Sequence, residues 1–197
     1  MERWMLLTFF LIHFSATFAW RSWRVWRQSG INPYVLPTGD DLDGYLAKAF
    51  RVVLCLTALY AATQAVVPQA DRLLGVIDWL RMPLVQGFGW TLLVASLVLV
   101  AVAQAQMGAS WRIGIDRDNQ TALVSGGVFA WSRNPIFLGM RLSLLGLFLV
   151  RPNGLTLMLL AAGDLLMQLQ VRQEEAYLST LHGAAYTDYC ARTRRWC

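Results

Sequence analysis

Five apolar stretches, separated by polar segments, organise this chain. They cover residues 4–20, 49–67, 84–105, 136–150 and 155–171. A helix needs about 20 mainly apolar residues to cross the hydrocarbon core of a bilayer, and each stretch approaches that length. The pattern therefore predicts an all-α, polytopic integral membrane protein with about five transmembrane helices.

The last two stretches are short and closely spaced. Only Arg151, Pro152, Asn153 and Gly154 separate them. Proline, asparagine and glycine favour a tight turn. We therefore expect the last two membrane helices to form a tight hairpin.

Each arm of this predicted hairpin carries one charged residue within its apolar sequence. Arg141 lies before the turn and Asp164 lies after it, at roughly equal distances along two antiparallel helices. A charge inside a membrane is costly unless it is paired or functional. We therefore predict an ion pair between Arg141 and Asp164.

The composition supports the same class of protein. Of the 197 residues, 56% are hydrophobic, which is too apolar for a soluble domain of this size. We interpret the chain as one membrane domain, 1–197, in which a three-span region, 1–105, precedes a core, 106–197, that ends in a helical tail. Three cysteines indicate no disulfide framework. His13, in the first stretch, has no second ligand at metal-binding spacing, so we expect a polar contact between helices there and no metal site.

The chain is also basic, with a net charge of +5 at pH 7. Such a charge could indicate nucleic-acid binding. However, the clearest basic cluster, residues 20–27, alternates tryptophan and arginine directly after the first apolar stretch, and both residue types are enriched at the level of lipid headgroups. We therefore expect the lipid bilayer, and no nucleic acid, as the partner.

The positions of the basic residues predict an orientation. With five spans, most of the 17 lysine and arginine residues fall on one side of the membrane. The positive-inside rule then places the N-terminus outside and the polar loops and the C-terminus in the cytoplasm. The cytoplasmic set is Arg21, Arg24, Arg27, Lys48, Arg51, Arg112, Arg117, Arg133, Arg172, Arg192, Arg194 and Arg195, against Arg3, Arg72, Arg81 and Arg151 outside.

Two polar segments flank the predicted hairpin. Because two membrane crossings separate them, both segments should meet at the cytoplasmic face. We expect a functional site where they meet. The first is Leu123-Val124-Ser125-Gly126-Gly127-Val128-Phe129, running on through Arg133-Asn134-Pro135-Ile136-Phe137-Leu138-Gly139, and the second starts at Glu174-Glu175 and closes with His182-Gly183, Tyr186, Tyr189 and Arg194-Arg195-Trp196.

In this order, and with a hairpin between them, the two segments resemble the isoprenylcysteine carboxyl methyltransferase and phospholipid methyltransferase superfamily of integral membrane enzymes. The resemblance covers roughly residues 107–197. It implies an enzyme that uses S-adenosylmethionine as methyl donor. The acceptor would be a lipophilic small molecule or a lipidated group that enters from the bilayer.

The resemblance also implies where the donor binds. Glu174 and Glu175 can receive the donor ammonium, and the free N–H groups of a helix that begins at Pro135 suit its carboxylate. Arg133 and Arg172 lie beside these positions and are the candidate catalytic residues. The candidate donor-binding residues are Thr121, Ala122, Leu123, Val124, Phe129, Asn134, Pro135, Ile136, Phe137, Glu174 and Glu175.

The chain departs from the family pattern at several of these positions. Asn134 stands where the carboxyl methyltransferases have histidine, and it cannot titrate near neutral pH, so it should not be a general base. Phe129 and Phe137 stand where those enzymes have tyrosine. Gln170 stands where the prenylcysteine enzymes have an arginine that meets the substrate carboxylate. The acceptor therefore stays open among a prenylcysteine, a phospholipid headgroup, a small thiol and a quinone-like lipid.

Two other functions are compatible with the sequence. One is a membrane reductase of the sterol reductase type, which would bind NADPH and would need more polar and basic cytoplasmic sequence than this chain offers. The other is a non-catalytic relative that acts as a membrane scaffold, which the loss of histidine and tyrosine from the motif allows. Binding of the methyl donor to the purified protein separates these functions.

Overall fold

The computed structural model describes residues 2–37, 39–114, 116, 119 and 121–197 and shows a helical protein in this part of the chain. Arg117, one of the basic residues counted above, lies outside the described residues. The helices are α1 (Glu2–Phe14), the π-helix η1 (Ser15–Trp20), α2 (Arg21–Ser29), α3 (Leu42–Val66), α4 (Pro83–Met107), α5 (Pro135–Val150), α6 (Gly154–His182) and α7 (Ala184–Arg192), with short 3-10 segments at η2 (Pro68–Leu74), η3 (Asp78–Leu80), η4 (Gly108–Ser110) and η5 (Gly127–Ala130).

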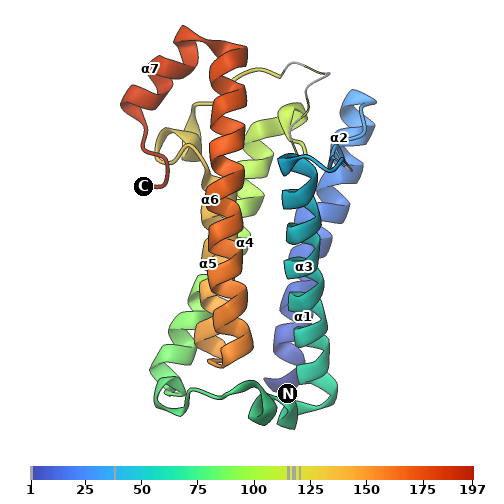
Figure 1. The fold of residues 1–197 in the computed structure, drawn as a ribbon, viewed down its shortest axis with the longest axis vertical. Helices are drawn as coiled ribbons and strands as arrows, with labels where there is room; N and C mark the ends of the chain where they lie inside the picture. Colours follow the sequence, from blue (N-terminus) through green and yellow to red (C-terminus); the bar gives the residue numbers. More distant parts are fainter. Residues whose placement is uncertain (1, 38, 115, 117–118, 120) are drawn as a thin grey trace.

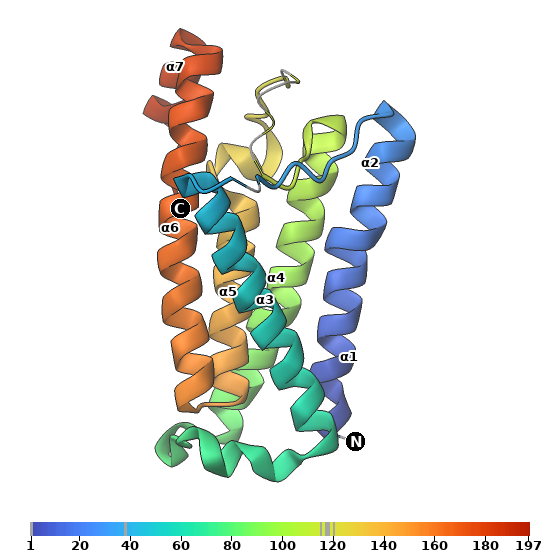
Figure 2. The ribbon, with the colours of Figure 1, turned by 45° about the vertical axis from the view of Figure 1, so that its right-hand side comes forward.

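The long helices stand side by side in one bundle (Figure 1). The N-terminus, the segment 67–82 and the turn between α5 and α6 lie at one end, whereas α2 and α7 lie at the other (Figures 1 and 2). The polar loops before and after the predicted hairpin are therefore at the same end of the bundle.

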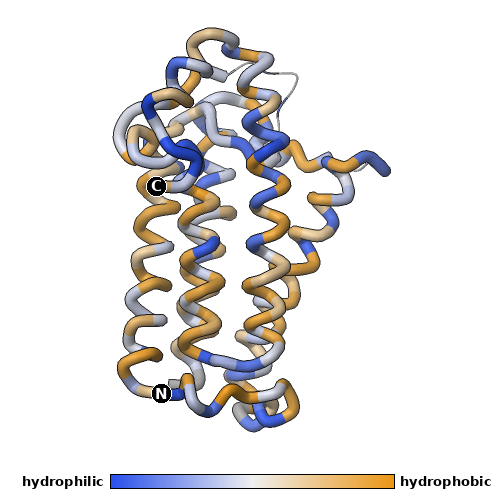
Figure 3. The backbone as a smooth tube through the Cα atoms, turned by 60° about the vertical axis from the view of Figure 1, so that its left-hand side comes forward, coloured by the Kyte–Doolittle hydropathy of each residue, from blue (hydrophilic) through white to orange (hydrophobic). Residues whose placement is uncertain are grey.

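Three helices are long and apolar enough to cross a membrane: Leu42–Val66, Pro83–Ser110 and Gly154–His182. α5 is equally apolar but has only 16 residues. Hydrophobic residues dominate the middle of the bundle, and hydrophilic residues concentrate toward its two ends (Figure 3). The prediction of an all-α membrane architecture is confirmed to this extent.

Local chemistry determines where the helices begin. α5 begins at Pro135, as predicted, because proline lacks the N–H that the first helical turn leaves unpaired anyway. α6 begins after Asn153, which forms a capping box with Thr156. α3 begins earlier than the apolar stretch at residue 49, because the side chain of Asp41 accepts a hydrogen bond of 2.9 Å from the N–H of Gly44.

Glycines let α4 and α5 approach closely. A Cβ atom added at Gly146 of α5 would lie 2.8 Å from the carbonyl oxygen of Gly89 on α4, and one added at Gly139 would lie 2.5 Å from Val100. Membrane helices associate through such small residues because lipid offers no hydrophobic driving force between helices. The close α4–α5 contact therefore fixes α5, whose first turn belongs to the predicted site.

A buried carboxylate ties the opposite end of the bundle together. Asp71 accepts hydrogen bonds from Tyr60 at 2.8 Å and from Gln64 at 2.7 Å, both on α3. It also accepts one from Asn153, in the hairpin turn, at 3.2 Å, and it pairs with Arg81 at 3.1 Å. Because these partners come from three segments, Asp71 sets the position of the hairpin relative to α3.

The structure confirms the ion pair within the hairpin. Nε of Arg141 lies 2.5 Å from Oδ1 of Asp164. The guanidinium of Arg141 also lies 4.4 Å from the centre of the Trp196 ring, a distance typical of a cation–π contact. The end of the chain therefore packs against the middle of the hairpin.

Removing one partner of this pair should destabilise the protein more than removing both. Arg141→Leu or Asp164→Leu leaves a single charge in an apolar span, which costs about 2.5–3.5 kcal/mol. We expect each variant to reduce the yield of folded protein, measured by size-exclusion chromatography in detergent, and the double variant to recover much of it. Strictly additive losses would contradict the pairing.

Candidate functional site

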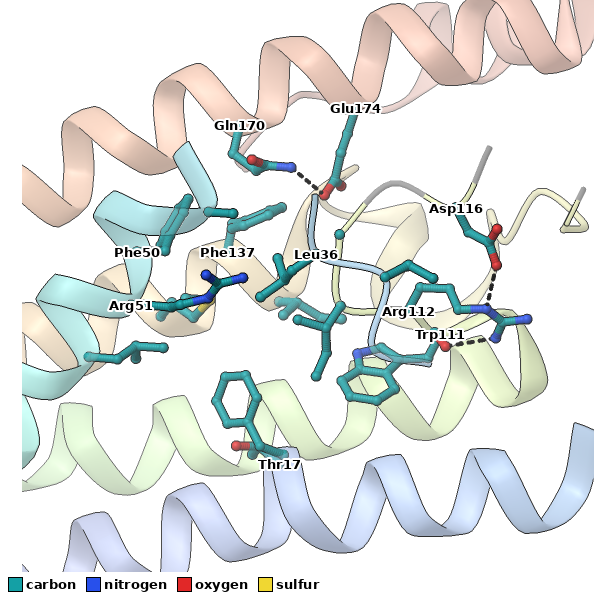
Figure 4. A pocket seen from close by; sticks show the side chains of 18 of the residues that line it. Thr17, Leu36, Phe50, Arg51, Trp111, Arg112, Asp116, Phe137, Gln170 and Glu174 are labelled. Atoms are coloured by element: carbon teal, nitrogen blue, oxygen red, sulfur yellow. Dashed lines mark hydrogen bonds and ion pairs between the residues drawn. The ribbon is translucent and has the colours of Figure 1, made fainter. Parts of the chain in front are cut away.

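A cavity of about 550 Å³ opens between the helices near the end of the bundle that carries the polar loops. Side chains from α1, η1, α3, α4, α5 and α6 line it. Residues 35–37 and 111–114, from two loops, complete the lining. Hydrogen bonds join these loops: the N–H of Ile113 donates to the carbonyl of Pro33 at 2.8 Å, and the N–H of Val35 donates to the carbonyl of Ile113 at 3.1 Å. Figure 4 shows the cavity between α3 and α6.

Glu174 faces this cavity from α6. Gln170 lies one helical turn before it, also lines the cavity, and donates a hydrogen bond of 3.4 Å to Oε1 of Glu174 (Figure 4). No residue in the described part of the chain forms an ion pair with Glu174. Its carboxyl group is therefore available to a cationic ligand.

Glu175 has a different role, since it points toward the loop before α5 and the C-terminal tail. One carboxylate oxygen accepts from Nε and Nη2 of Arg195 at 2.9 and 2.7 Å, and the other lies 3.2 Å from Nη2 of Arg133. The hydrogen bonds from Arg195 to Glu175 raise the pKa of that guanidinium. Glu175 therefore joins the two polar segments that the sequence predicts to meet.

Some of the predicted donor-binding residues line the cavity, and the others lie outside its lining. Ile136 and Phe137 line the cavity together with Glu174. Asn134 is buried beside the tail, where its side chain donates to the carbonyl of Arg195 at 3.1 Å. The other predicted residues outside the cavity lining are Thr121, Ala122, Leu123, Val124, Phe129, Pro135 and Glu175.

Phe129 belongs to the packing beneath the tail. The hydroxyl of Tyr189, on α7, donates to the carbonyl of Phe129 at 2.6 Å. Burial raises the pKa of Tyr189 to about 12, so this hydroxyl remains a donor over the physiological range. α7 is therefore held against the loop that precedes α5.

Neither candidate catalytic arginine lines the cavity. Arg133 is engaged by Glu175. Arg172 donates to the carbonyl of Gln168, on its own helix, at 2.8 Å on an exposed face. Neither arginine therefore belongs to the wall of the cavity, and a catalytic role for them stays a prediction.

Most of the cavity wall comes from residues that the sequence did not single out as site residues. Thr17 lies in η1, and its carbonyl accepts a hydrogen bond of 3.0 Å from Gln104 on α4. Asp43, at the start of α3, accepts one of 3.0 Å from Gln173. Arg51 lines the cavity about two turns further along α3 (Figure 4). Only Arg51 carried a signal in the sequence, as a charge within an apolar stretch.

Comparison with protein families identifies the chain. The model of the phospholipid methyltransferase family matches residues 84–185, more than half of the sequence. The chain belongs to the phospholipid methyltransferase family. The resemblance that the two polar segments carry is thereby confirmed, and within this family the match covers α4, the loop before α5, the hairpin and the tail as far as α7.

One solved structure supports the same fold. This chain is similar to the eukaryotic intramembrane Ras methyltransferase, an isoprenylcysteine carboxyl methyltransferase solved without a monobody, with a TM-score of 0.54 and 18% identity over 95% of this chain. The chain spans 65% of the length of that protein. No curated protein matches the sequence.

In the described residues, no group of three histidine, cysteine, aspartate or glutamate side chains could hold a metal ion.

The adjacent glutamates should differ in their effect on stability. Glu175→Gln removes the charge that contacts Arg133 and Arg195, and we expect it to lower the free energy of unfolding by about 1.5–3 kcal/mol. Glu174→Gln makes the same chemical change without losing an ion pair, and it should leave the thermal midpoint nearly unchanged. Thermal unfolding in detergent measures both. A larger loss for Glu174→Gln would contradict this assignment.

Proposed function

We propose that this protein is a membrane methyltransferase that transfers a methyl group from S-adenosylmethionine to a lipophilic acceptor. Membership of the phospholipid methyltransferase family and the fold support a membrane methyltransferase. The observation that carries the proposal is Glu174, a carboxylate without an ionic partner among the described residues, in a cavity that the first turn of α5 also lines.

The cavity suits this donor in size and chemistry. Its volume of about 550 Å³ falls within the range of about 300–1,000 Å³ of small-molecule sites. The carboxylate of Glu174 suits the donor ammonium, and the aromatic faces of Phe137 and Trp111 suit its adenine and its sulfonium. The unpaired N–H groups of the first turn of α5, at Ile136 and Phe137, suit its carboxylate.

The protein has little chemistry to supply. When bound, S-adenosylmethionine supplies a methyl group that the positive sulfur already activates. The lone pair of the acceptor forms a bond to the methyl carbon, while the carbon–sulfur bond breaks and leaves its electron pair on sulfur. The side chains of the cavity then act by aligning the two reactants and excluding water. Asn134 cannot serve as a general base, so the acceptor should be a nucleophile that is already deprotonated or neutral and basic.

We also propose that all five apolar helices cross the membrane. The continuous helix formed by α1, η1 and α2, and the shorter α5, would then join the three long apolar helices. The end that carries Arg21, Arg112 and Arg133 would face the cytoplasm, and the N-terminus would lie outside. In this arrangement the cavity is open to a cytoplasmic donor and adjoins the bilayer that holds the acceptor.

S-adenosylhomocysteine, the product of the donor, should bind the detergent-solubilised protein and raise its thermal midpoint, because a ligand that binds only the folded state stabilises it. Glu174→Gln should weaken this binding by about tenfold or more, as expected for loss of a charge-assisted hydrogen bond. Glu175→Gln is the matched control and should bind nearly as well as the unaltered protein.

Isothermal titration calorimetry measures these affinities directly. NADPH serves as the alternative ligand in the same experiment. Heat and stabilisation with NADPH, and none with saturating S-adenosylhomocysteine, would establish the reductase instead. Equal losses in the two glutamate variants would show that Glu174 does not contact the donor.

A further inference from the structure

Arg51 is a cation in the cavity wall without a counter-charge. Its Nε atom is buried and has no hydrogen-bond partner, and no described residue forms an ion pair with it. Arg112, the other arginine of the wall, is paired with Asp116 at 3.0 Å. Arg51 therefore contributes an unneutralised positive charge to the cavity.

None of the described carboxylates that line the cavity forms an ion pair with Arg51. Asp41 caps α3 through the N–H of Gly44, and Asp43 accepts from Gln173. Both lie two to three turns before Arg51 along α3. Glu174 accepts from Gln170. These acidic groups gather at the polar end of the cavity, which leaves Arg51 alone at a deeper level.

An unpaired arginine within an apolar helix is costly, and such residues are usually paired or functional. The described protein supplies no anion for Arg51, so a ligand is the remaining source of the counter-charge. Gln170, across the cavity on α6 (Figure 4), is neutral. The positive charge available to a bound anion at this depth therefore comes from α3.

The surroundings of Arg51 indicate what kind of anion this is. A second, smaller cavity of about 50 Å³ adjoins the first, and its lining is mainly apolar, with His13, Thr57 and Ser143 as the polar residues. Phe50 and Leu54, on α3 beside Arg51, line both cavities. The side chains that continue the second cavity include Phe10, Phe14, Val53, Leu144 and Met167. Arg51 thus lies in the first cavity close to its border with the second, an arrangement that suits an amphiphile with an anionic head.

We propose that Arg51 binds an anionic group, a carboxylate or a phosphate, on the methyl acceptor, whose apolar chain leads away past the second cavity, which at about 50 Å³ holds only a small part of it. The identification of this ligand as the methyl acceptor rests on the proposed function, whereas the anion site itself does not. It narrows the acceptor class to anionic amphiphiles. The cationic donor keeps the acidic end of the cavity, so the two ligands meet between Glu174 and Arg51.

The test compares three single-chain probes that differ only in the head: tetradecanoate, tetradecyl phosphate and tetradecanol. Each is titrated against the protein in a neutral detergent, and the apparent Kd is taken from the shift in thermal midpoint. The unaltered protein should bind at least one anionic probe about tenfold or more tightly than tetradecanol. The better of the two anions identifies the head group as carboxylate or phosphate.

Arg51→Gln should remove this preference, and Arg51→Lys should keep part of it, because lysine retains the charge but not the planar fork of donors. Lys48→Gln is the matched control. Lys48 lies one turn away on the same helix, is exposed, and pairs with Asp40 rather than facing the cavity. This control should keep the full preference. Equal binding of anionic and neutral probes by the unaltered protein would overturn the proposal, even if Arg51→Gln fails to fold.

Binding of S-adenosylhomocysteine to the same samples separates the two proposals. Arg51→Gln should change that affinity by less than about threefold, since the acceptor rather than the donor has lost its partner. A loss of about tenfold, with binding of 5′-methylthioadenosine unchanged, would assign Arg51 to the donor carboxylate and overturn the inference. If S-adenosylhomocysteine does not bind at all, the proposed function fails, while the head-group comparison still decides whether Arg51 binds an anion.

Discussion

One carboxylate, Glu175, holds the two polar segments of this protein together. It contacts Arg133 before α5 and Arg195 in the tail, so the start of one hairpin helix and the end of the chain share a single counter-charge. Successive residues on a helix project about 100° apart. When Glu175 faces the tail, its neighbour Glu174 must face another direction, and that direction is the cavity. The ion pairs of Glu175 and the position of Glu174 in the cavity are therefore consequences of the same helix orientation.

The opposite end of the bundle obeys the same constraint. In an apolar environment, a polar group must find its partners within the protein. Asp71 collects donors from α3, the hairpin turn and the segment between α3 and α4. The two ends thus each use one carboxylate to gather several segments, and the close α4–α5 packing between them keeps the hairpin in place. The cavity lies between these two helices and α1, η1, α3 and α6.

Local rules predicted the hairpin, the start of α5 at Pro135 and the pairing of Arg141 with Asp164, because each depends on a turn, a cap or a matched position along two neighbouring helices. The contribution of the N-terminal half to the cavity was not predictable in this way. α3 and α4 are apolar on most faces, so their sequences carry no amphipathic pattern that tells which face points inward. For Arg51, only the tertiary arrangement reveals whether a charge meets lipid, a partner helix or a cavity.

The π-helix η1 has a consequence for the geometry of the first helix. A π-turn accommodates one extra residue, so the helix beyond it is rotated by about 100° relative to the helix before it. α1 can therefore turn His13 toward the cavity, while α2 turns Arg21 toward the end of α4, where its guanidinium donates to the carbonyl of Gly108. The inserted residue thus changes the angle between the helix face that carries His13 and the helix face that carries Arg21. Evolution could thus re-aim one half of this helix by gaining or losing a single residue, without altering a contact of the other half.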